Sequence, residues 1–336
     1  MKIIIPMAGR GSRLRPHTLL TPKPLLPVAG KPIVQRLAED IVEVYDGQVD
    51  EIAFIIGAFG KEVEAQLKEI ATSLGARASI YYQDEPLGTA HALYMAHPSL
   101  EGEVVVAYAD TLFVADFKLD SSQDGVIWVK KVDDPSAFGV VTVGEKGIIE
   151  EFVEKPKDFV SDLAIIGIYY FKDGKNLSDE LKYLLDNNIQ VKGEYQLTDA
   201  LENMKAKGLR FTPGEVSEWM DCGNKQAVLD TTERILTLDH QRGKKLVADS
   251  VLLDNALVIP PCHIGEGVRI SNSVVGPHVF IGEQTTVTNS VVSRSAIREH
   301  SHIDNAVLKD AMIGSHARYA PEAASPDISD YSSIGS

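Results

Sequence analysis

The chain has 336 residues, of which 44% are hydrophobic and 24% charged, the composition of an ordinary globular protein long enough for two domains. Its formal net charge of -15 argues against nucleic acid as a partner, because nucleic-acid binding favours a basic face. No apolar stretch approaches the roughly 18 residues of a membrane span, and no signal-peptide pattern opens the chain. Cys222 and Cys262 lack metal-binding spacing and are typical of reduced thiols. We therefore expect a cytoplasmic protein without a membrane partner.

The first 235 residues or so alternate between predicted strands and helices. Apolar runs predict strands at 2–6, 51–56, 78–83 and 103–109, and helical spacing predicts helices at 33–45, 61–74 and 89–96. This alternation favours a mostly parallel sheet with helices on both faces. Ligands of such sheets bind beyond the carboxyl ends of the strands. The loops after Ile5, Gln83 and Ala109 should therefore gather at one edge.

The middle of the chain has a different pattern. Strands separated by turns are predicted at 125–131, 139–143, 148–153 and 164–171, with helices at 175–187, 197–207 and 226–238. Strands that follow one another without intervening helices indicate a mixed sheet. We expect one α/β domain over residues 1–240, with its last helix leading out of it.

A repeat begins after residue 245. The segments DNALVI, SNSVVG, TNSVVS and DNAVLK begin at residues 254, 271, 288 and 304, which are 17, 17 and 16 residues apart. An apolar residue at every fifth or sixth position, with three sides per turn, predicts a parallel β-helix over residues 246–317. Irregular β-rich structure is the alternative. Residues 318–336 are polar and acidic, and we expect them to be disordered.

The loop after the first strand concentrates positive charge. No Asp or Glu precedes Glu39, so the basic residues before it have no acidic neighbour in sequence. The loop lacks both the P-loop motif and the third glycine of the dinucleotide fingerprint. Even so, glycine amides and a basic cluster suit a polyphosphate, although a solvated basic loop is the alternative. The cluster comprises Lys2, Arg10, Arg13, Arg15, Lys23, Lys31 and Arg36.

The segment MAGRGSRLRP…TPKPLLPVAGKP resembles the signature of sugar-1-phosphate nucleotidyltransferases, also called nucleoside-diphosphate-sugar pyrophosphorylases. Later segments agree in order: Gln83 with PLGTA, Asp110 after a buried strand, EKP at 154–156, GIY at 167–169, GEY at 193–195 and WMDCG at 219–223. The match covers about 235 residues. It implies a Rossmann-like mixed-sheet catalytic domain. The β-helix tail is similar to that of long-form glucose-1-phosphate thymidylyltransferases, which implies a left-handed β-helix of hexapeptide type.

The resemblance also implies the site. Asp110 and Asp221 would bind Mg²⁺, for which two carboxylates and substrate phosphate oxygens are suitable ligands. Gln83 would read the base with its donor and acceptor groups, above Gly88. The expected catalytic residues are Arg15, Lys23, Asp110 and Lys155. The nucleotide would contact Ala8, Gly9, Gly11, Ser12, Arg13, Gln83, Gly88 and Thr89, and the sugar phosphate would contact Glu154, Lys155, Gly167 and Glu194.

The implied reaction joins a nucleoside triphosphate, dTTP or UTP, to a hexose 1-phosphate, which we expect to be glucose 1-phosphate. A sugar-phosphate oxygen attacks the α-phosphorus and expels pyrophosphate. Because this nucleophile is already an anion, catalysis needs positioning and charge neutralisation rather than a protein base. A homo-oligomer is expected, assembled through the tail.

Three alternatives stay open. Ala109, Cys222 and Asn224 depart from the usual family residues, which leaves the choice of nucleotide and sugar open. The chain could be a silent subunit that binds a nucleotide sugar and acts on a partner through its β-helix. The tail histidines could instead serve an acyltransferase, since β-helix acyltransferases use a histidine as base.

Overall fold

The computed structural model describes residues 1–9, 11–45, 47–115, 118–322, 324 and 329. Its contacts divide the chain into two compact units: residues 1–26 with 31–224, and residues 27–30 with 225–336. Helix α6 (Lys225–Gln241) thus groups with the tail, whereas the sequence pattern placed it in the first domain. No helix in the described part of the chain is both long enough and apolar enough to span a bilayer.

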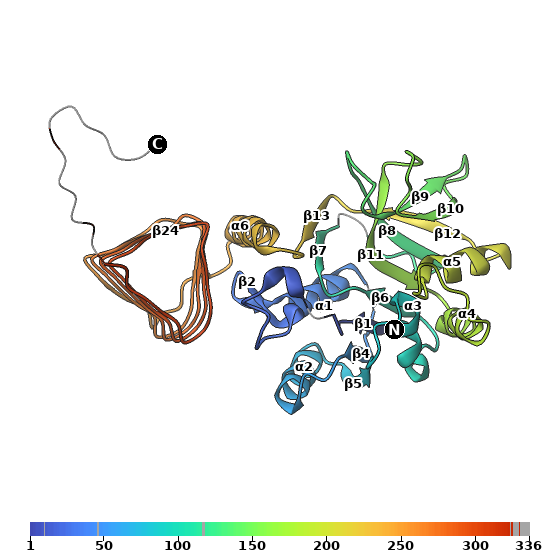
Figure 1. Ribbon diagram of the computed structural model, residues 1–336, viewed down its shortest axis with the longest axis horizontal. Helices are drawn as coiled ribbons and strands as arrows, with labels where there is room; N and C mark the ends of the chain where they lie inside the picture. The colour runs from blue at the N-terminus through green and yellow to red at the C-terminus, as the bar shows by residue number, and fades with distance from the viewer. Residues whose placement is uncertain (10, 46, 116–117, 323, 325–328, 330–336) are drawn as a thin grey trace. The chain divides into compact units, whose positions relative to one another are not determined.

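The first unit is built on a mixed sheet that, among the described residues, has nine strands (Figure 1). Strands β6, β1, β4 and β5 are parallel, as predicted, while β11 runs antiparallel to β6, β8 and β9. The sheet order is β10-β9-β11-β6-β1-β4-β5, and β8 pairs with both β11 and β12. The strands are β1 (Lys2–Pro6), β4 (Glu51–Ile56), β5 (Arg77–Tyr82), β6 (Val104–Ala107), β8 (Gly125–Lys131), β9 (Gly139–Val143), β10 (Ile149–Glu154), β11 (Leu163–Phe171) and β12 (Phe211–Glu215).

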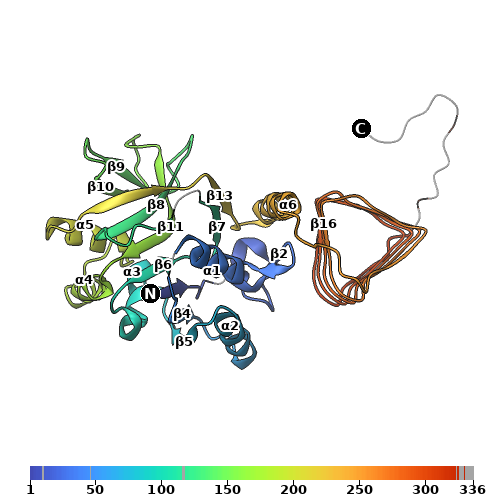
Figure 2. The same ribbon diagram turned by 180° about the vertical axis from the view of Figure 1, so that it is seen from behind.

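Helices cover both faces of this sheet, as the alternating pattern predicts. Helices α1 (Ile33–Val44) and α2 (Lys61–Ser73) lie on one side (Figure 2). Helices α3 (Thr89–Met95), α4 (Gly174–Asp186) and α5 (Leu197–Ala206) lie on the other. Because both faces are covered, the central strands β1 and β6 are continuous apolar runs with almost no exposed side chain.

A short antiparallel pair was missed by the sequence pattern. Strand β7 (Thr111–Val114) pairs with β13 (Glu218–Asp221), which places Thr111 opposite Asp221. The backbone N–H of Cys222 donates to the carbonyl of Asp110 at 3.0 Å. This ladder fixes the two predicted metal ligands, Asp110 and Asp221, beside each other.

The second unit contains the predicted β-helix, whose short parallel strands stack in three sheets around a triangular core (Figure 1). Its apolar interior includes Ile270, Val275 and Ile281 from successive sides of one turn. One sheet is β14 (Leu252–Asp254), β17 (Arg269–Ser271), β20 (Thr286–Thr288), β23 (His302–Asp304) and β26 (Arg318–Tyr319). The others are β15 (Leu257–Val258), β18 (Val274–Val275), β21 (Val291–Ser293) and β24 (Val307–Lys309), and β16 (Cys262–Ile264), β19 (Val279–Ile281), β22 (Ala296–Ile297) and β25 (Met312–Ile313).

The asparagine of each repeat forms a corner of the β-helix. Asn255, Asn272 and Asn289 have φ near +48°, a left-handed conformation that asparagine tolerates better than most residues. The side chain of Asn255 donates to that of Asn272 at 2.9 Å, and Asn272 donates to Asn289 at 3.3 Å. The sequence repeat therefore reflects the left-handed backbone conformation at each corner as well as the apolar side chains of the interior. Strand β26 extends the β-helix beyond the predicted limit of residue 317, and most of residues 320–336 lie outside the described part of the chain.

A segment of the signature region belongs to the second unit. Residues 27–30, which include β2 (Pro27–Val28), group with the tail, and α6 contacts β2. Gly30 has a φ of +91°, and a Cβ on it would lie 2.3 Å from the His263 ring. His263 in turn packs on Phe280, at 5.6 Å between ring centroids, and Phe280 clusters with Leu229 of α6. The segment, the helix and the β-helix therefore share one packed face.

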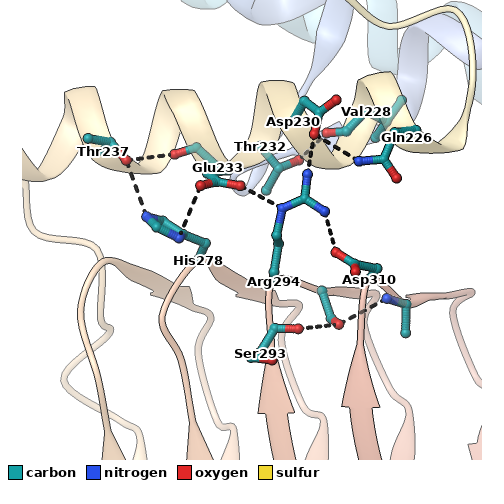
Figure 3. Close-up of polar contacts among 12 residues, drawn as sticks. Gln226, Val228, Asp230, Thr232, Glu233, Thr237, His278, Ser293, Arg294 and Asp310 are labelled. Carbon is teal, nitrogen blue, oxygen red and sulfur yellow. Dashed lines mark hydrogen bonds and ion pairs between the residues drawn. The ribbon is translucent and has the colours of Figure 1, made fainter. Parts of the chain in front are cut away.

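An arginine joins α6 to the β-helix (Figure 3). Arg294, at a β-helix corner, pairs with Asp230 and Glu233 of α6 and with Asp310 of the next turn, and its Nε donates to Glu233 at 2.6 Å. His278 lies 3.5 Å from Glu233 on the same helix face. The Arg294 side chain is only 23% exposed, so these pairs are partly shielded from water. One cation thus holds together three carboxylates that would otherwise repel one another.

Replacing Arg294 with methionine should destabilise the second unit by about 1–2 kcal/mol, because three carboxylates would lose their shared cation at a partly shielded site. Scanning calorimetry of the full chain should show one transition moving to lower temperature. Lys245→Met is the control, since it removes an exposed pair between residues four apart and should cost less than about 0.5 kcal/mol. An equal loss of stability in the two variants would contradict the stabilising role of the Arg294 ion pairs.

Candidate active site

A cavity of about 1050 Å³ opens in the first unit, at the carboxyl ends of β1 and β6. Almost every site residue implied by the family resemblance lines it. Arg15 is the exception: its side chain is exposed and it does not line the cavity, so its catalytic role stays a prediction. The predicted residues that line the cavity are Ala8, Gly9, Gly11, Ser12, Arg13, Lys23, Gln83, Gly88, Thr89, Asp110, Glu154, Lys155, Gly167, Glu194 and Asp221.

The opening loop is folded around Lys23. Gly11 has a φ of +59°, and a Cβ there would lie 2.8 Å from the Cβ of Lys23, so this close approach requires glycine. The hydroxyl of Thr18 donates to the Gly11 carbonyl at 2.7 Å and fixes the turn. Lys23 Nζ lies 3.1 Å from Asp110 Oδ2, and only 13% of the Lys23 side chain is exposed. The loop therefore delivers a shielded cation to the end of β6.

Asp110 and Asp221 form a coupled acidic pair beside Lys23. Burial raises the pKa of Asp221 above its usual range and the charge of Asp110 raises it further, while Lys23 lowers it. Two carboxylates suit a hard divalent cation that takes its remaining ligands from phosphates and water. The donor set thus fits the predicted Mg²⁺, whose binding stays a proposal.

At one end of the cavity, Gln83 directly follows β5. Its side-chain Nε2 lies 3.3 Å from the Gly88 carbonyl and 3.3 Å from His91 Nδ1. Gly88 has a φ of +107°, and a Cβ there would lie 2.4 Å from the carbonyl oxygen of Tyr195. The structure therefore explains this glycine by close backbone packing, where the sequence analysis assigned it to the space beneath the base. The hydroxyl of Thr89 accepts from Leu197 N at 3.0 Å and ties α3 to α5.

Lys155, which also lines the cavity, departs from the expected backbone conformation. A residue before proline is biased toward extended backbone, yet Lys155 has a φ of +44°. Its N–H donates to the carbonyl of Phe138 at 3.1 Å, and its Nζ lies 3.6 Å from Glu154 Oε1. Backbone strain of this kind is held in place by surrounding contacts and is common at functional sites. Here it accompanies two charged side chains that line the cavity.

Tyr108 is a lining residue that the sequence analysis missed, because the run EVVVAYA predicts only a buried strand. Its ring packs below Gly167, where a Cβ would lie 3.4 Å from the ring, and its N–H donates to the Gly167 carbonyl at 3.0 Å. Burial raises the pKa of the phenol far above its ordinary value; the Thr89 hydroxyl opposes this, and Asp110 and Glu154 add to it. The buried Tyr108 hydroxyl makes no hydrogen bond of ordinary geometry with any described residue.

An aromatic wall was also missed. Phe138 and Trp219 meet edge to face with ring centroids 4.9 Å apart, and both line the cavity. Trp219 lies on β13, two residues before Asp221. Its position follows from the pairing of β7 with β13. The periodicity of the sequence did not predict this strand pair.

A cavity lined by a cationic loop, paired carboxylates and a second lysine is typical of a nucleotidyl-transfer site. The model of the nucleotidyl transferase family matches residues 2–237, and the chain belongs to this family. It is 31% identical over 283 residues to the mannose-1-phosphate guanylyltransferase catalytic subunit beta of Drosophila melanogaster, covering 80% of this chain and 72% of that protein. It is 29% identical to the bifunctional protein GlmU of Methanococcus maripaludis, covering 78% of this chain and 62% of that protein.

Solved structures agree with this assignment. A Bacillus anthracis protein described as a glucose-1-phosphate thymidylyltransferase, in complex with sucrose, is 28% identical with a TM-score of 0.57, covering 69% of this chain and 94% of that one. A UDP-glucose pyrophosphorylase bound to UDP-glucose, 24% identical with a TM-score of 0.59, shares the fold over 70% of this chain and 98% of that one. The expected family and the expected fold, an α/β nucleotidyltransferase domain followed by a left-handed β-helix, are confirmed.

Replacing Asp110 with asparagine should lower kcat for pyrophosphate release by roughly 10²–10³-fold, because the site loses half of its paired negative charge. The fold should stay intact, since the backbone carbonyl of residue 110 still accepts from Cys222 N. Asp133→Asn, at an exposed aspartate outside the cavity, is the control. Full activity of the Asp110 variant, with circular dichroism like that of the wild type, would contradict the role of this carboxylate.

Proposed function

We propose that the protein transfers a nucleotidyl group from dTTP or UTP to glucose 1-phosphate, releasing pyrophosphate. The observation that supports this most strongly is the convergence of Lys23, Asp110, Asp221 and Lys155 on one cavity from four distant segments of the chain. The family of the chain makes sugar-1-phosphate nucleotidyl transfer the reaction class. The particular base and sugar rest on the sequence resemblance.

In the proposed reaction, a phosphate oxygen of the sugar 1-phosphate attacks the α-phosphorus of the nucleotide. The new P–O bond forms as the bond to the β-phosphate bridge breaks, and the electron pair leaves with pyrophosphate. A divalent cation held by Asp110 and Asp221 would neutralise phosphate charge. Lys23 and Arg13 would hold the β- and γ-phosphates. Lys155 would hold the phosphate of the sugar, so that the two anions are brought together in line.

A similar protein suggests a second substrate pair. The Drosophila relative is a mannose-1-phosphate guanylyltransferase, so GTP with mannose 1-phosphate is the competing assignment within the same reaction class. Assembly into a homo-oligomer and a cytoplasmic location stay predictions from the sequence. The silent-subunit alternative loses support because Lys23, Lys155 and both aspartates are retained in one cavity.

A screen of nucleoside triphosphates against sugar 1-phosphates, read as pyrophosphate release with Mg²⁺, tests the proposal. We expect turnover only when both substrates are present, fastest with dTTP or UTP and glucose 1-phosphate, and its loss when EDTA removes divalent cations. Fastest turnover with GTP and mannose 1-phosphate would overturn the substrate assignment but not the reaction class. Binding of a nucleotide sugar without turnover of any pair would establish the silent subunit instead.

Replacing Lys155 with alanine should raise KM for the sugar 1-phosphate at least about tenfold, because a charge-assisted contact to phosphate is lost. KM for the nucleotide should change little. Lys157→Ala, at an exposed lysine two residues further on, is the matched control. An effect confined to the nucleotide would contradict the assignment of this lysine to the sugar phosphate.

A further inference from the structure

The carboxamide of Gln83 is held in one orientation. One of its two terminal atoms faces the carbonyl oxygen of Gly88 at 3.3 Å, and a carbonyl can only accept a hydrogen bond. The facing atom must therefore be the NH₂ group. The same Nε2 lies 3.3 Å from His91 Nδ1, so two acceptors of the protein face this NH₂ group. The carbonyl oxygen Oε1 is the only atom of this amide left to meet a ligand in the cavity.

His91 can play its part in only one protonation state. Because the Gln83 NH₂ group donates, His91 Nδ1 must accept, which requires a neutral ring with its proton on Nε2. The ring is half-buried in the first turn of α3. Burial lowers the pKa of His91, although the charge of Glu85 raises it. The neutral form that the geometry requires is therefore the one that the surroundings favour.

We propose that His91 is a positioning residue that locks Gln83 with its oxygen toward the base, so that the site selects bases carrying a ring N–H on the pairing edge. This proposal deepens the proposed function and rests on it, since it takes Gln83 as the base-reading residue. Uracil and thymine carry this N–H at N3, and guanine carries it at N1. Cytosine and adenine present a lone pair at the matching ring nitrogen.

Discrimination follows from the fixed amide. Oε1 accepts a hydrogen bond from a ring N–H, but it repels a ring lone pair and leaves both groups without a partner in a closed site. An amide free to rotate could offer its NH₂ group to cytosine or adenine instead. The Gly88 carbonyl and His91 Nδ1 each provide one contact at 3.3 Å, which is long for a hydrogen bond. Neither contact alone would hold the amide firmly, so the second contact, to His91, adds to the cost of rotation.

The test measures kcat/KM for UTP, dTTP, GTP, CTP and ATP with one sugar 1-phosphate. The wild type should favour UTP, dTTP or GTP over both CTP and ATP. His91→Leu should reduce that ratio roughly tenfold, since one orienting hydrogen bond is lost. His91→Asn should restore most of it, because the asparagine oxygen can accept near the position of Nδ1. His97→Leu, at an exposed histidine that stacks on Tyr94, is the matched control and should leave the ratio unchanged.

Other outcomes separate this proposal from the function it rests on. A wild-type preference for CTP or ATP would overturn the locked orientation, and so would an unchanged ratio in His91→Leu when Gln83→Ala alters it. An unchanged ratio in Gln83→Ala would overturn the base-reading role itself. If no substrate pair is turned over, the proposed reaction fails. Calorimetric binding of UTP and CTP to the same variants then still decides whether His91 sets the preference.

Discussion

The ion pair between Lys23 and Asp110 is the constraint on which the site depends. It joins the opening loop to the end of β6, across 87 residues of sequence, at a distance of 3.1 Å. Lys23 is nearly buried, and it reaches this position only because Gly11 lets the loop close over it. The chain has a net charge of -15, and the pair keeps the cation of Lys23 at the site. A polyphosphate that binds there could replace Asp110 as the partner of this lysine. Within this pair, the charge of one carboxylate offsets the charge of one lysine.

The β7–β13 ladder adds a second carboxylate, Asp221, beside this pair. Its register sets Asp221 opposite Thr111, so the short ladder that follows Asp110 also positions the second carboxylate. The same strand, β13, positions Trp219 against Phe138 in the cavity. A perturbation of this short ladder would therefore change metal affinity and the shape of the cavity together.

The sequence predicts the long elements well because their periodicity is strong. The parallel strands, the helices α1 to α5 and the β-helix repeats lie within a residue or two of their predicted ranges. The β7–β13 pair was missed because two four-residue strands far apart in the chain have too little periodicity to stand out. Almost all of the site residues that the family motifs predict line the cavity. The motifs could not show the positive φ of Lys155, the packing that requires Gly88, or the burial of the Tyr108 hydroxyl. Each of these depends on tertiary neighbours.

The packing of Gly30 on His263 has a consequence for how this chain can change over evolution or by engineering. The second unit is connected to the first at three peptide bonds, 26–27, 30–31 and 224–225. Two of the unit boundaries fall within three residues of Lys23 and Asp221. A tail grafted from a relative at residue 225 would thus meet a foreign segment at residues 27–30. At residue 30, a side chain larger than glycine's would collide with a histidine ring at position 263. The tail packs with four residues of the catalytic signature, residues 27–30. A successful chimera must therefore exchange the tail and these four residues together.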